Sequence, residues 1–280
     1  MNSETCTVIT GASQGLGKAF AEECAIHGRA LVLAALPDTG LPEVARWIER
    51  VHGVRVHALE VDLTCDDGPG RLARFVEERG LAVDALVNNA GVGFNGRFGE
   101  SEPAQNETTI RLNTLALVAI TRLLLPALRG NERAHVLNVA SLAAFFPMPW
   151  LPVYSSSKSF VLAFSLALRE ELRGTGVSVS VVCPNGIRTN RGARELIARQ
   201  GLAGRLTCQY PEQVARAALK GMFAGRAVIV PGPVNRFIRF ASVLVPRAIA
   251  MGVITRRWNA EARLSAPQRS AASRLNVAGV

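Results

Sequence analysis

The sequence predicts an α/β fold: a doubly wound parallel sheet of about seven strands with helices on both faces. Two observations lead to this prediction. Short apolar runs recur along the chain, and segments with helical patterning separate them. The runs are bounded by Gly, Asp or Asn, which is typical of strands buried on both faces of a sheet that helices cover. Strands that alternate with helices in this way form a parallel sheet.

The expected elements alternate in order along the chain. Each strand is one of the apolar runs, at residues 5–10, 30–35, 54–61, 83–88, 134–140, 177–183 and 227–230. One helix is expected between each strand and the next, near residues 16–28, 42–52, 69–80, 104–129, 153–173 and 211–224. The alternation ends near residue 232.

Length and composition favour one large domain with a basic extension. The chain has 280 residues, of which 49% are apolar and 19% charged, an ordinary balance for a globular protein. We expect one domain over residues 1–232 and an extension over residues 233–280. The extension holds eight arginines and one acid, so it carries +7 of the net charge of +10. Because most of the positive charge lies there, we expect no nucleic-acid partner.

Cysteines and histidines show no disulfide or metal-binding spacing. The five cysteines include no Cys-x-x-Cys pair, and their odd count does not fit a disulfide framework. The four histidines fall outside any triad spacing, so we expect no bound metal. The first ten residues lack the basic segment and apolar run of a signal peptide. These features predict a cytoplasmic protein with reduced thiols.

A glycine-rich segment, Thr10-Gly11-Ala12-Ser13-Gln14-Gly15-Leu16-Gly17, joins the first expected strand to the first helix. Glycines let the backbone turn tightly and approach a pyrophosphate, and the helix N-terminus supplies free N–H groups and a positive dipole. A tight turn without a ligand would give a similar pattern. The position at the first strand-to-helix junction favours a dinucleotide site.

Tyr154 and Lys158 stand four residues apart on an expected helix, so their side chains share one face. The chain has only three lysines among 32 basic residues, so a lysine here is not a default surface charge. An unperturbed tyrosine has a pKa of about 10, and a nearby cation favours the phenolate. A compact ammonium can also hydrogen-bond a ribose, which a planar guanidinium does poorly. The pair therefore predicts acid/base chemistry.

These segments resemble the motifs of the short-chain dehydrogenase/reductase family. The glycine segment has its Thr-Gly-x-x-x-Gly-x-Gly form, and Asp62-Leu63 and Asn88-Asn89-Ala90-Gly91 follow the third and fourth strands, as the family's adenine-pocket and sheet-stabilising motifs do. The resemblance implies a Rossmann-type catalytic domain that binds NAD(P). The cofactor-binding residues that it implies are Gly11, Ser13, Gln14, Gly15, Leu16, Gly17, Ala35, Asp62, Leu63, Asn89, Ala90, Gly91, Tyr154, Lys158, Pro184, Ile187 and Thr189.

The resemblance also assigns catalytic roles. Tyr154 is the general acid/base, and Lys158 assists it and holds the nicotinamide ribose. Ser141, thirteen residues before Tyr154, would hydrogen-bond the reacting oxygen, although an isolated serine there could equally cap a helix or loop. Asn113 would anchor a water in the proton relay, against the alternative of a structural role.

Two positions leave details open. Ala35 occupies the position at which the family selects its cofactor, and it is neither the acid that favours NAD nor the base that favours NADP. The sequence therefore favours NADP(H) only slightly. Asn185 stands where the family has a glycine, between the matching Pro184 and Ile187, which puts the local backbone geometry in question.

The expected substrate is hydrophobic. Residues 142–153, which border the substrate in the family, carry no charge, although plain core packing would explain about half of them. The implied reaction is hydride transfer between the nicotinamide and an apolar ketone or secondary alcohol, such as a 3-oxoacyl or steroid-like compound. The alternative is a scaffold or redox sensor that binds NAD(P) without turnover.

The extension has three readings. Residues 236–258 mix apolar residues with arginines, contain no uncharged stretch of 18 residues and include Pro246, so they are not expected to span a membrane. A role as a lid or dimer contact and attachment to a membrane surface are equally favoured. The third hypothesis is a protein whose principal function is membrane docking through this extension. The resemblance implies a homodimer or homotetramer through the helices near residues 104–129 and 153–173.

Overall fold

The computed structural model describes residues 5–188, 207–245, 251–252 and 255–256. Within these residues, seven strands form one parallel sheet in the order β3-β2-β1-β4-β5-β6-β7. The strands are β1 (Thr5–Thr10), β2 (Ala30–Ala35), β3 (Val56–Glu60), β4 (Ala82–Asn88), β5 (Ala134–Val139), β6 (Val177–Val182) and β7 (Val228–Ile229). The predicted doubly wound, Rossmann-type sheet is confirmed.

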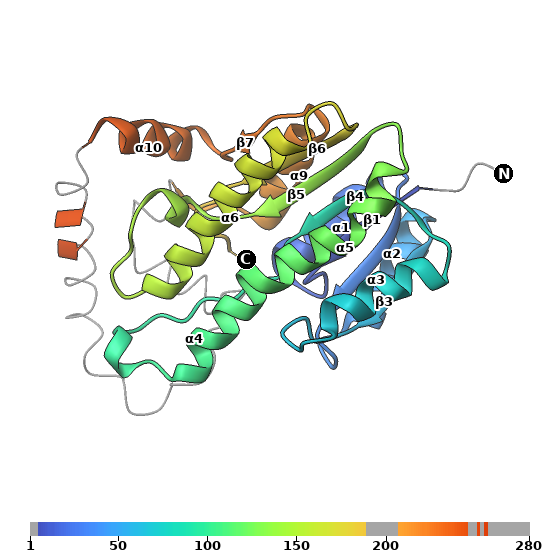
Figure 1. The fold of residues 1–280 in the computed structure, drawn as a ribbon, viewed down its shortest axis with the longest axis horizontal. Coiled ribbons are helices and arrows are strands. Elements are labelled where there is room, and N and C mark those ends of the chain that lie inside the picture. The colour runs from blue at the N-terminus through green and yellow to red at the C-terminus, as the bar shows by residue number, and fades with distance from the viewer. Residues whose placement is uncertain (1–4, 189–206, 246–250, 253–254, 257–280) are drawn as a thin grey trace.

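Helices cover both faces of the sheet. One face packs against α1 (Gly15–Ile26), α2 (Leu41–His52) and α9 (Pro211–Phe223). The other packs against α3 (Gly68–Glu78), α5 (Leu117–Arg129) and α6 (Pro152–Glu171), and Figure 1 shows α5 and α6 lying across β4 and β5. Each face encloses a core of aliphatic side chains, as the apolar runs of the strands predict.

The strand order reverses between β1 and β4. β1 pairs with β2 on one side and with β4 on the other, so the connections that leave these strands run to opposite sides of the sheet. A crevice forms outside the carboxyl ends of the strands at such a point. The glycine-rich segment after β1 and the Asn-Asn-Ala-Gly segment after β4 both open onto it.

The helix expected near residues 104–129 is interrupted. It consists of α4 (Pro103–Ile110), a π-helical stretch η2 (Arg111–Ala116) and α5. The turns of η2 are wider than those of an α-helix, and Asn113 lies within them. Its side chain is buried and hydrogen-bonds the chain after β4. Periodicity cannot anticipate this, because the cause is a tertiary contact.

The same run, Pro103–Arg129, is long and apolar enough to cross a membrane by length and composition alone. Core helices of globular proteins meet the same criterion. Here Ile120, Leu124 and Leu128 are buried in the core between this helix and the sheet.

A further helix, α10 (Pro233–Leu244), follows β7 and was not expected from the sequence. It begins after Gly232, whose φ of +83° suits glycine, and has Pro233 in its first turn, a favoured place for proline. Most of the extension beyond it lies outside the described residues. Two 3-10 turns, η1 (Phe98–Glu100) and η3 (Leu142–Phe145), lie near the carboxyl edge of the sheet.

Candidate active site

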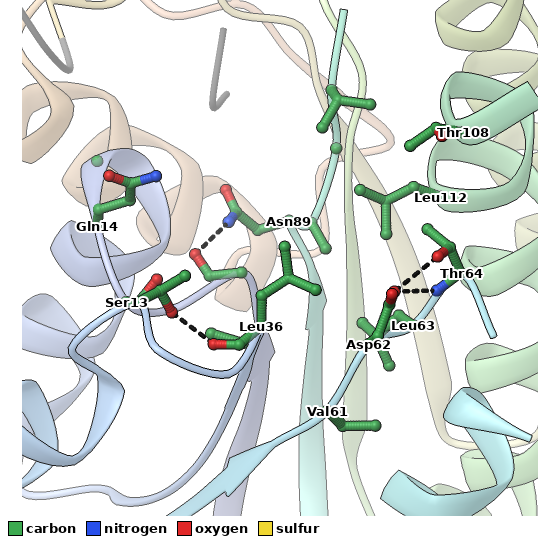
Figure 2. A pocket seen from close by; sticks show the side chains of 17 residues that line it. Ser13, Gln14, Leu36, Val61, Asp62, Leu63, Thr64, Asn89, Thr108 and Leu112 are labelled. Carbon is green, nitrogen blue, oxygen red and sulfur yellow. Dashed lines mark hydrogen bonds between the residues drawn. The ribbon is translucent and has the colours of Figure 1, made fainter. Parts of the chain in front are cut away.

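A cavity of about 320 Å³ lies at the carboxyl ends of β1, β2 and β4. Figure 2 shows Ser13 and Gln14 on one side of it and Asp62 and Thr64 on the other, with Asn89 between them. Ten of the predicted cofactor residues line it: Gly11, Ser13, Gln14, Gly15, Ala35, Asp62, Leu63, Asn89, Ala90 and Gly91. Segments far apart in the sequence therefore meet where the motifs predict a dinucleotide.

The glycine segment has the backbone that its composition requires. Gly11 and Gly15 have φ of +66° and +56°, a region that disfavours a side chain. A Cβ on Gly17 would lie 2.0 Å from the carbonyl oxygen of Gly11, so Gly17 lets α1 pack directly on the loop. Leu16 is buried in the core. Neither Leu16 nor Gly17 lines the cavity, and the contacts seen for both are packing contacts.

Asn89 ties the end of β4 to the glycine segment. Its Nδ2 donates to the carbonyl oxygens of Thr10 and Gly11 at 2.9 and 3.2 Å. The Thr10 hydroxyl in turn accepts from the backbone N–H groups of Asn89 and Ala90, both at 3.0 Å. These bonds hold the two sides of the crevice at a fixed separation.

The side chains around the cavity fit the adenosine half of a nicotinamide cofactor. Asp62 is the only charged residue among those that line it in the described chain. Thr64 donates to Asp62 Oδ1 from both its N–H and its hydroxyl, at 2.8 and 2.7 Å, which fixes the carboxylate toward the cavity wall. The Oδ1 atom of Asn89 is buried without a hydrogen-bond partner in the protein, as expected of an atom beside a ligand site. The other side chains that line the cavity are uncharged: they are apolar, carry hydroxyl groups, or are the amides of Gln14 and Asn89.

Several lining residues lie outside the motifs that the sequence identified: Leu36, Thr39, Val61, Thr64, Val92, Thr108 and Leu112. Four of them stand next to predicted residues in the sequence, and this position was the only signal for them: Leu36, Val61, Thr64 and Val92. Thr108 and Leu112 come from the helical run 103–129, and only the tertiary fold brings them to the cavity.

Tyr154 and Lys158 lie one turn apart on α6, as predicted. The Lys158 ammonium lies 5.7 Å from the centroid of the Tyr154 ring and donates to the carbonyl oxygen of Val139 at 2.9 Å. Lys158 is buried, with 1% of its surface exposed. Because Lys158 is buried and hydrogen-bonded to the end of β5, its ammonium is held in one position and is not a surface charge.

The pKa shifts at the pair differ from the expected ones. Burial lowers the pKa of Lys158 to about 8, while neighbouring Cys183 acts to raise it. Burial raises the pKa of Tyr154 to about 12, and the hydrogen bond with Ser141, rather than the charge of Lys158, acts to lower it. In this structure the phenol is therefore held in its protonated form, ready to act as an acid.

Ser141 caps a turn beside Tyr154, and its role at the reacting oxygen stays a prediction. Its hydroxyl accepts from the N–H of Ala143 at 3.1 Å, which caps η3, and it also hydrogen-bonds Tyr154. The cap fixes the serine rotamer beside the phenol. The structural and the catalytic interpretations of Ser141 are therefore compatible.

Asn113 makes structural contacts. Its Oδ1 accepts from the N–H of Val92 and its Nδ2 donates to the carbonyl oxygen of Val92 and to the Ser157 hydroxyl, all at 2.9 Å. A Cβ on Gly91 would lie 3.1 Å from both Asn113 Oδ1 and Lys158 Nζ. The side chain thus joins η2, the chain after β4 and α6 directly behind Tyr154 and Lys158. Its role as a water anchor stays a prediction.

The family follows from comparison with known proteins. Residues 5–198 match the family model of the short chain dehydrogenases. The chain belongs to this family. Among its relatives, the ketoacyl reductase HetN of Nostoc sp. is 32% identical over 77% of this chain and 74% of its own length.

Human 17-beta-hydroxysteroid dehydrogenase type 3 is 35% identical to this short-chain dehydrogenase over 65% of this chain, and the match spans 59% of the human protein. The chain thus spans about three fifths of the length of that relative. The solved structure of a short-chain dehydrogenase from Sphingobium yanoikuyae in complex with NADPH has a TM-score of 0.74 and 28% identity, over 90% of this chain and 95% of that one.

Gly93 packs against Tyr154 and belongs to none of the motifs in the sequence. A Cβ there would lie 2.6 Å from Cδ2 of Tyr154, so the glycine lets the chain after β4 pack on the tyrosine ring. Its position two residues beyond the Asn-Asn-Ala-Gly motif was the only signal in the sequence.

The segment after β6 lies apart from the cavity. Pro184 accepts a hydrogen bond from the N–H of Leu142 at 2.7 Å, and Ile187 forms a bridge with Gln209. Neither lines the cofactor cavity described above. Asn185 is not among the residues with positive φ, so its backbone does not need the family's glycine. Thr189 lies outside the described residues.

Proposed function

We propose that this protein is an NADP(H)-dependent oxidoreductase that reduces a hydrophobic ketone or oxidises the corresponding secondary alcohol. The observation that carries the proposal is the grouping of Ser141, Tyr154 and Lys158 next to a cavity suited to the adenosine half of the cofactor. A neutral phenol, a serine hydroxyl bonded to it and a buried ammonium are the groups that carbonyl reduction requires.

In this mechanism the bound nicotinamide supplies the hydride to the carbonyl carbon. Tyr154 donates its proton to the carbonyl oxygen, and Ser141 hydrogen-bonds the same oxygen and orients it. Lys158, fixed by Val139, stabilises the phenolate that Tyr154 becomes. For the oxidation of an alcohol, the same residues act in the reverse direction.

The preference for NADP(H) rests on the neutral site at the end of β2. Ala35 and Leu36 line the cavity there, together with the hydroxyls of Ser13 and Thr39, and Asp38, the first acid after β2, is not among the residues that line it. The relative from Sphingobium yanoikuyae binds NADPH. Because no base lines the cavity in the described chain, we expect a preference below about tenfold, or about 1.4 kcal/mol. Fluorescence titration with NADPH and NADH tests this; saturation with neither would contradict the cofactor assignment.

The substrate is proposed to contact Tyr154 from a small pocket that this residue lines. Phe94, Phe98, Pro152 and Val153 give the pocket apolar walls, and Ser101, Asn106 and Thr109 add polar groups. The chain between Ser141 and Tyr154 is uncharged. The two relatives described above are named for ketoacyl and hydroxysteroid substrates. We therefore propose an apolar acyl or polycyclic carbonyl compound as the substrate class.

A non-catalytic NAD(P)-binding scaffold or redox sensor is the competing function. The substitution Tyr154→Phe separates the two, because it removes the proton donor and leaves the cofactor cavity intact. An oxidoreductase loses turnover and keeps NADPH affinity, whereas a scaffold has no turnover to lose.

A second copy of the chain is the proposed oligomeric partner. The outer sides of the helical run 103–129 and of α6 expose Leu115, Leu123, Phe160 and Leu166. Apolar side chains on two neighbouring helices are typical of a subunit contact. Sedimentation of wild-type and Leu123→Glu protein tests this: the wild type should be dimeric or tetrameric, and the variant should dissociate.

The start of the extension supports contact with an anionic membrane surface. Phe237 and Phe240 are 69% and 63% exposed, three residues apart on α10, with Arg236 exposed beside them. Aromatic and basic residues on one short helix favour binding at a lipid interface. Vesicles containing anionic lipid should retain the wild type but not Phe237→Ser with Phe240→Ser; equal retention would contradict the contact.

A further inference from the structure

Asn235 is a buried polar residue at the start of α10 that none of the site motifs includes. It is 1% exposed. Its Nδ2 donates to the carbonyl oxygens of Thr207 and Pro231, each at 3.0 Å. Its Oδ1 accepts from Nδ2 of Asn185 at 3.4 Å. Both amide hydrogens and the amide oxygen are thus used, and each bond reaches a different segment of the chain.

These segments meet beside the loop that follows β6. Asn185 belongs to that loop, directly after Pro184. Thr207 precedes Gln209, whose N–H donates to Gly186 and whose carbonyl oxygen accepts from Arg188, each at 3.1 Å. Asn235 therefore contacts both sides of this short pairing and joins them to the turn before α10. It also provides the hydrogen-bond partner for Asn185, the residue that replaces the family's glycine.

The same helix supports the segment that begins at Ser141. Ile238 of α10 packs into a cluster with Leu142 and Phe145 of η3, and the guanidinium of Arg239 lies 5.6 Å from the centroid of the Phe145 ring. The N–H of Leu142 donates to Pro184 at 2.7 Å. The loop after β6, the start of η3 and α10 are therefore linked in one unit that Asn235 fixes to the rest of the chain.

We propose that Asn235 is a positioning residue of the active site. By holding Asn185 and Thr207 it sets the backbone of residues 184–187. We assign these residues to the nicotinamide half of the cofactor, because Pro184 is bonded to Leu142 beside Ser141, so the first turn of the C-terminal extension belongs to the catalytic unit. This inference rests on the proposed function. Alanine at residue 235 leaves two carbonyl oxygens and the Asn185 amide without their partner, and the loop after β6 loses its fixed position.

The adenosine half of the cofactor provides an internal control. Its cavity is lined by residues from Gly11 to Leu112, and none of them is among the hydrogen-bond partners of Asn235 and Asn185 in the described chain. A ligand without nicotinamide, 2′-phospho-ADP-ribose, should therefore bind independently of Asn235. Loss of general stability would instead weaken both ligands alike.

The experiment titrates the full-length wild type, Asn235→Ala, Asn185→Ala and the exposed control Arg236→Ala with NADPH and with 2′-phospho-ADP-ribose. We expect Asn235→Ala to weaken NADPH about tenfold, and Asn185→Ala, which breaks one long bond, about threefold, both with unchanged affinity for the analogue. Arg236→Ala should match the wild type with both ligands.

Unchanged NADPH affinity in Asn235→Ala, or an equal loss for both ligands, would overturn the positioning role and leave the proposed function standing. A wild type that binds neither ligand would overturn the proposed function and this inference together. If Asn235→Ala does not fold, Asn185→Ala decides: its side chain is partly exposed, and it must show the same nicotinamide-specific loss.

Discussion

Burial shifts the pKa values of both Tyr154 and Lys158. It lowers the pKa of the Lys158 ammonium to about 8 and raises the pKa of the Tyr154 phenol to about 12. The short spacing in the sequence predicted that the two side chains would share a helix face. It could not predict the pKa values, because the end of β5 and the chain after β4 create the environment.

The lowered pKa of Lys158 predicts a pH dependence of stability. Its pKa is about 8 in the folded protein and about 10.5 when unfolded. Between these values the unfolded chain binds more protons, so the burial penalty on the charged amine is relieved and the free energy of unfolding rises with pH. Buried Cys24 and Cys183, whose pKa values burial raises to about 12, lower the stability of both proteins above about pH 9, so the test is the difference between the wild type and Lys158→Met. In denaturant titrations from pH 8 to pH 10, the free energy of unfolding of the wild type should rise relative to that of the variant. Parallel pH profiles would show that Lys158 is not desolvated.

Gly93 predicts a steric effect on catalysis. A Cβ in Gly93→Ala would meet the Tyr154 ring at 2.6 Å and displace the phenol from Ser141. We expect kcat to fall about 10- to 100-fold, because a small misplacement of a reacting group is costly. Gly99→Ala is the matched control, since its Cβ would meet no atom within 4 Å and Gly99 does not line the pocket beside Tyr154. Steady-state kinetics with equal loss in the two variants would rule out the steric explanation.

At the scale of elements, the sequence predicted the bounds of most strands closely, but it did not predict the interruption of the long helix. β1, β2 and β4 to β6 occupy the apolar runs almost residue for residue, because a strand buried on both faces must be apolar throughout. The π-helical stretch η2 and the helix α10 were not predicted. Both depend on buried asparagines, Asn113 and Asn235, whose partners lie far away in the sequence.

The contacts of Asn113 predict its contribution to stability. Asn113→Ala leaves both polar backbone groups of Val92 without their side-chain partner, next to buried Ser157. We expect a loss of about 1–3 kcal/mol in the free energy of unfolding, the usual cost of buried polar groups left unpaired. Thr114→Ala, in the same π-helical stretch, removes only a local bond to Ile110 and should cost less. Urea denaturation would contradict the structural role if the two variants lost equal stability.

At the scale of the whole molecule, topology places the site. The alternation of strands and helices predicts a parallel sheet, and the reversal of strand order at β1 and β4 puts the glycine segment and the Asn-Asn-Ala-Gly segment on one crevice. The grouping of the cofactor residues was therefore predictable. The pocket proposed for the substrate was less predictable, since Phe94 and Phe98 come from a segment with no motif and line one pocket with residues of α6 only after folding.

The same topology predicts that cofactor binding stabilises the entire fold, because the cavity joins both sides of the sheet's switch point. At a hundredfold excess over Kd, NADPH should raise the free energy of unfolding by about 2.7 kcal/mol. Thermal melts should then show Tm higher by several degrees for the wild type. An unchanged Tm at saturating NADPH would mean that the cofactor does not bind the folded chain.

The most direct test of the account is the transfer of hydride itself. Wild-type protein and Tyr154→Phe are mixed with NADPH and a panel of apolar acyl and polycyclic ketones, and the oxidation of the cofactor is followed by its absorbance. We expect the wild type to turn over at least one ketone, and Tyr154→Phe to be slower by about 10²- to 10⁴-fold with NADPH affinity retained. Binding of NADPH without oxidation by any ketone, or equal rates in the two proteins, would contradict this expectation.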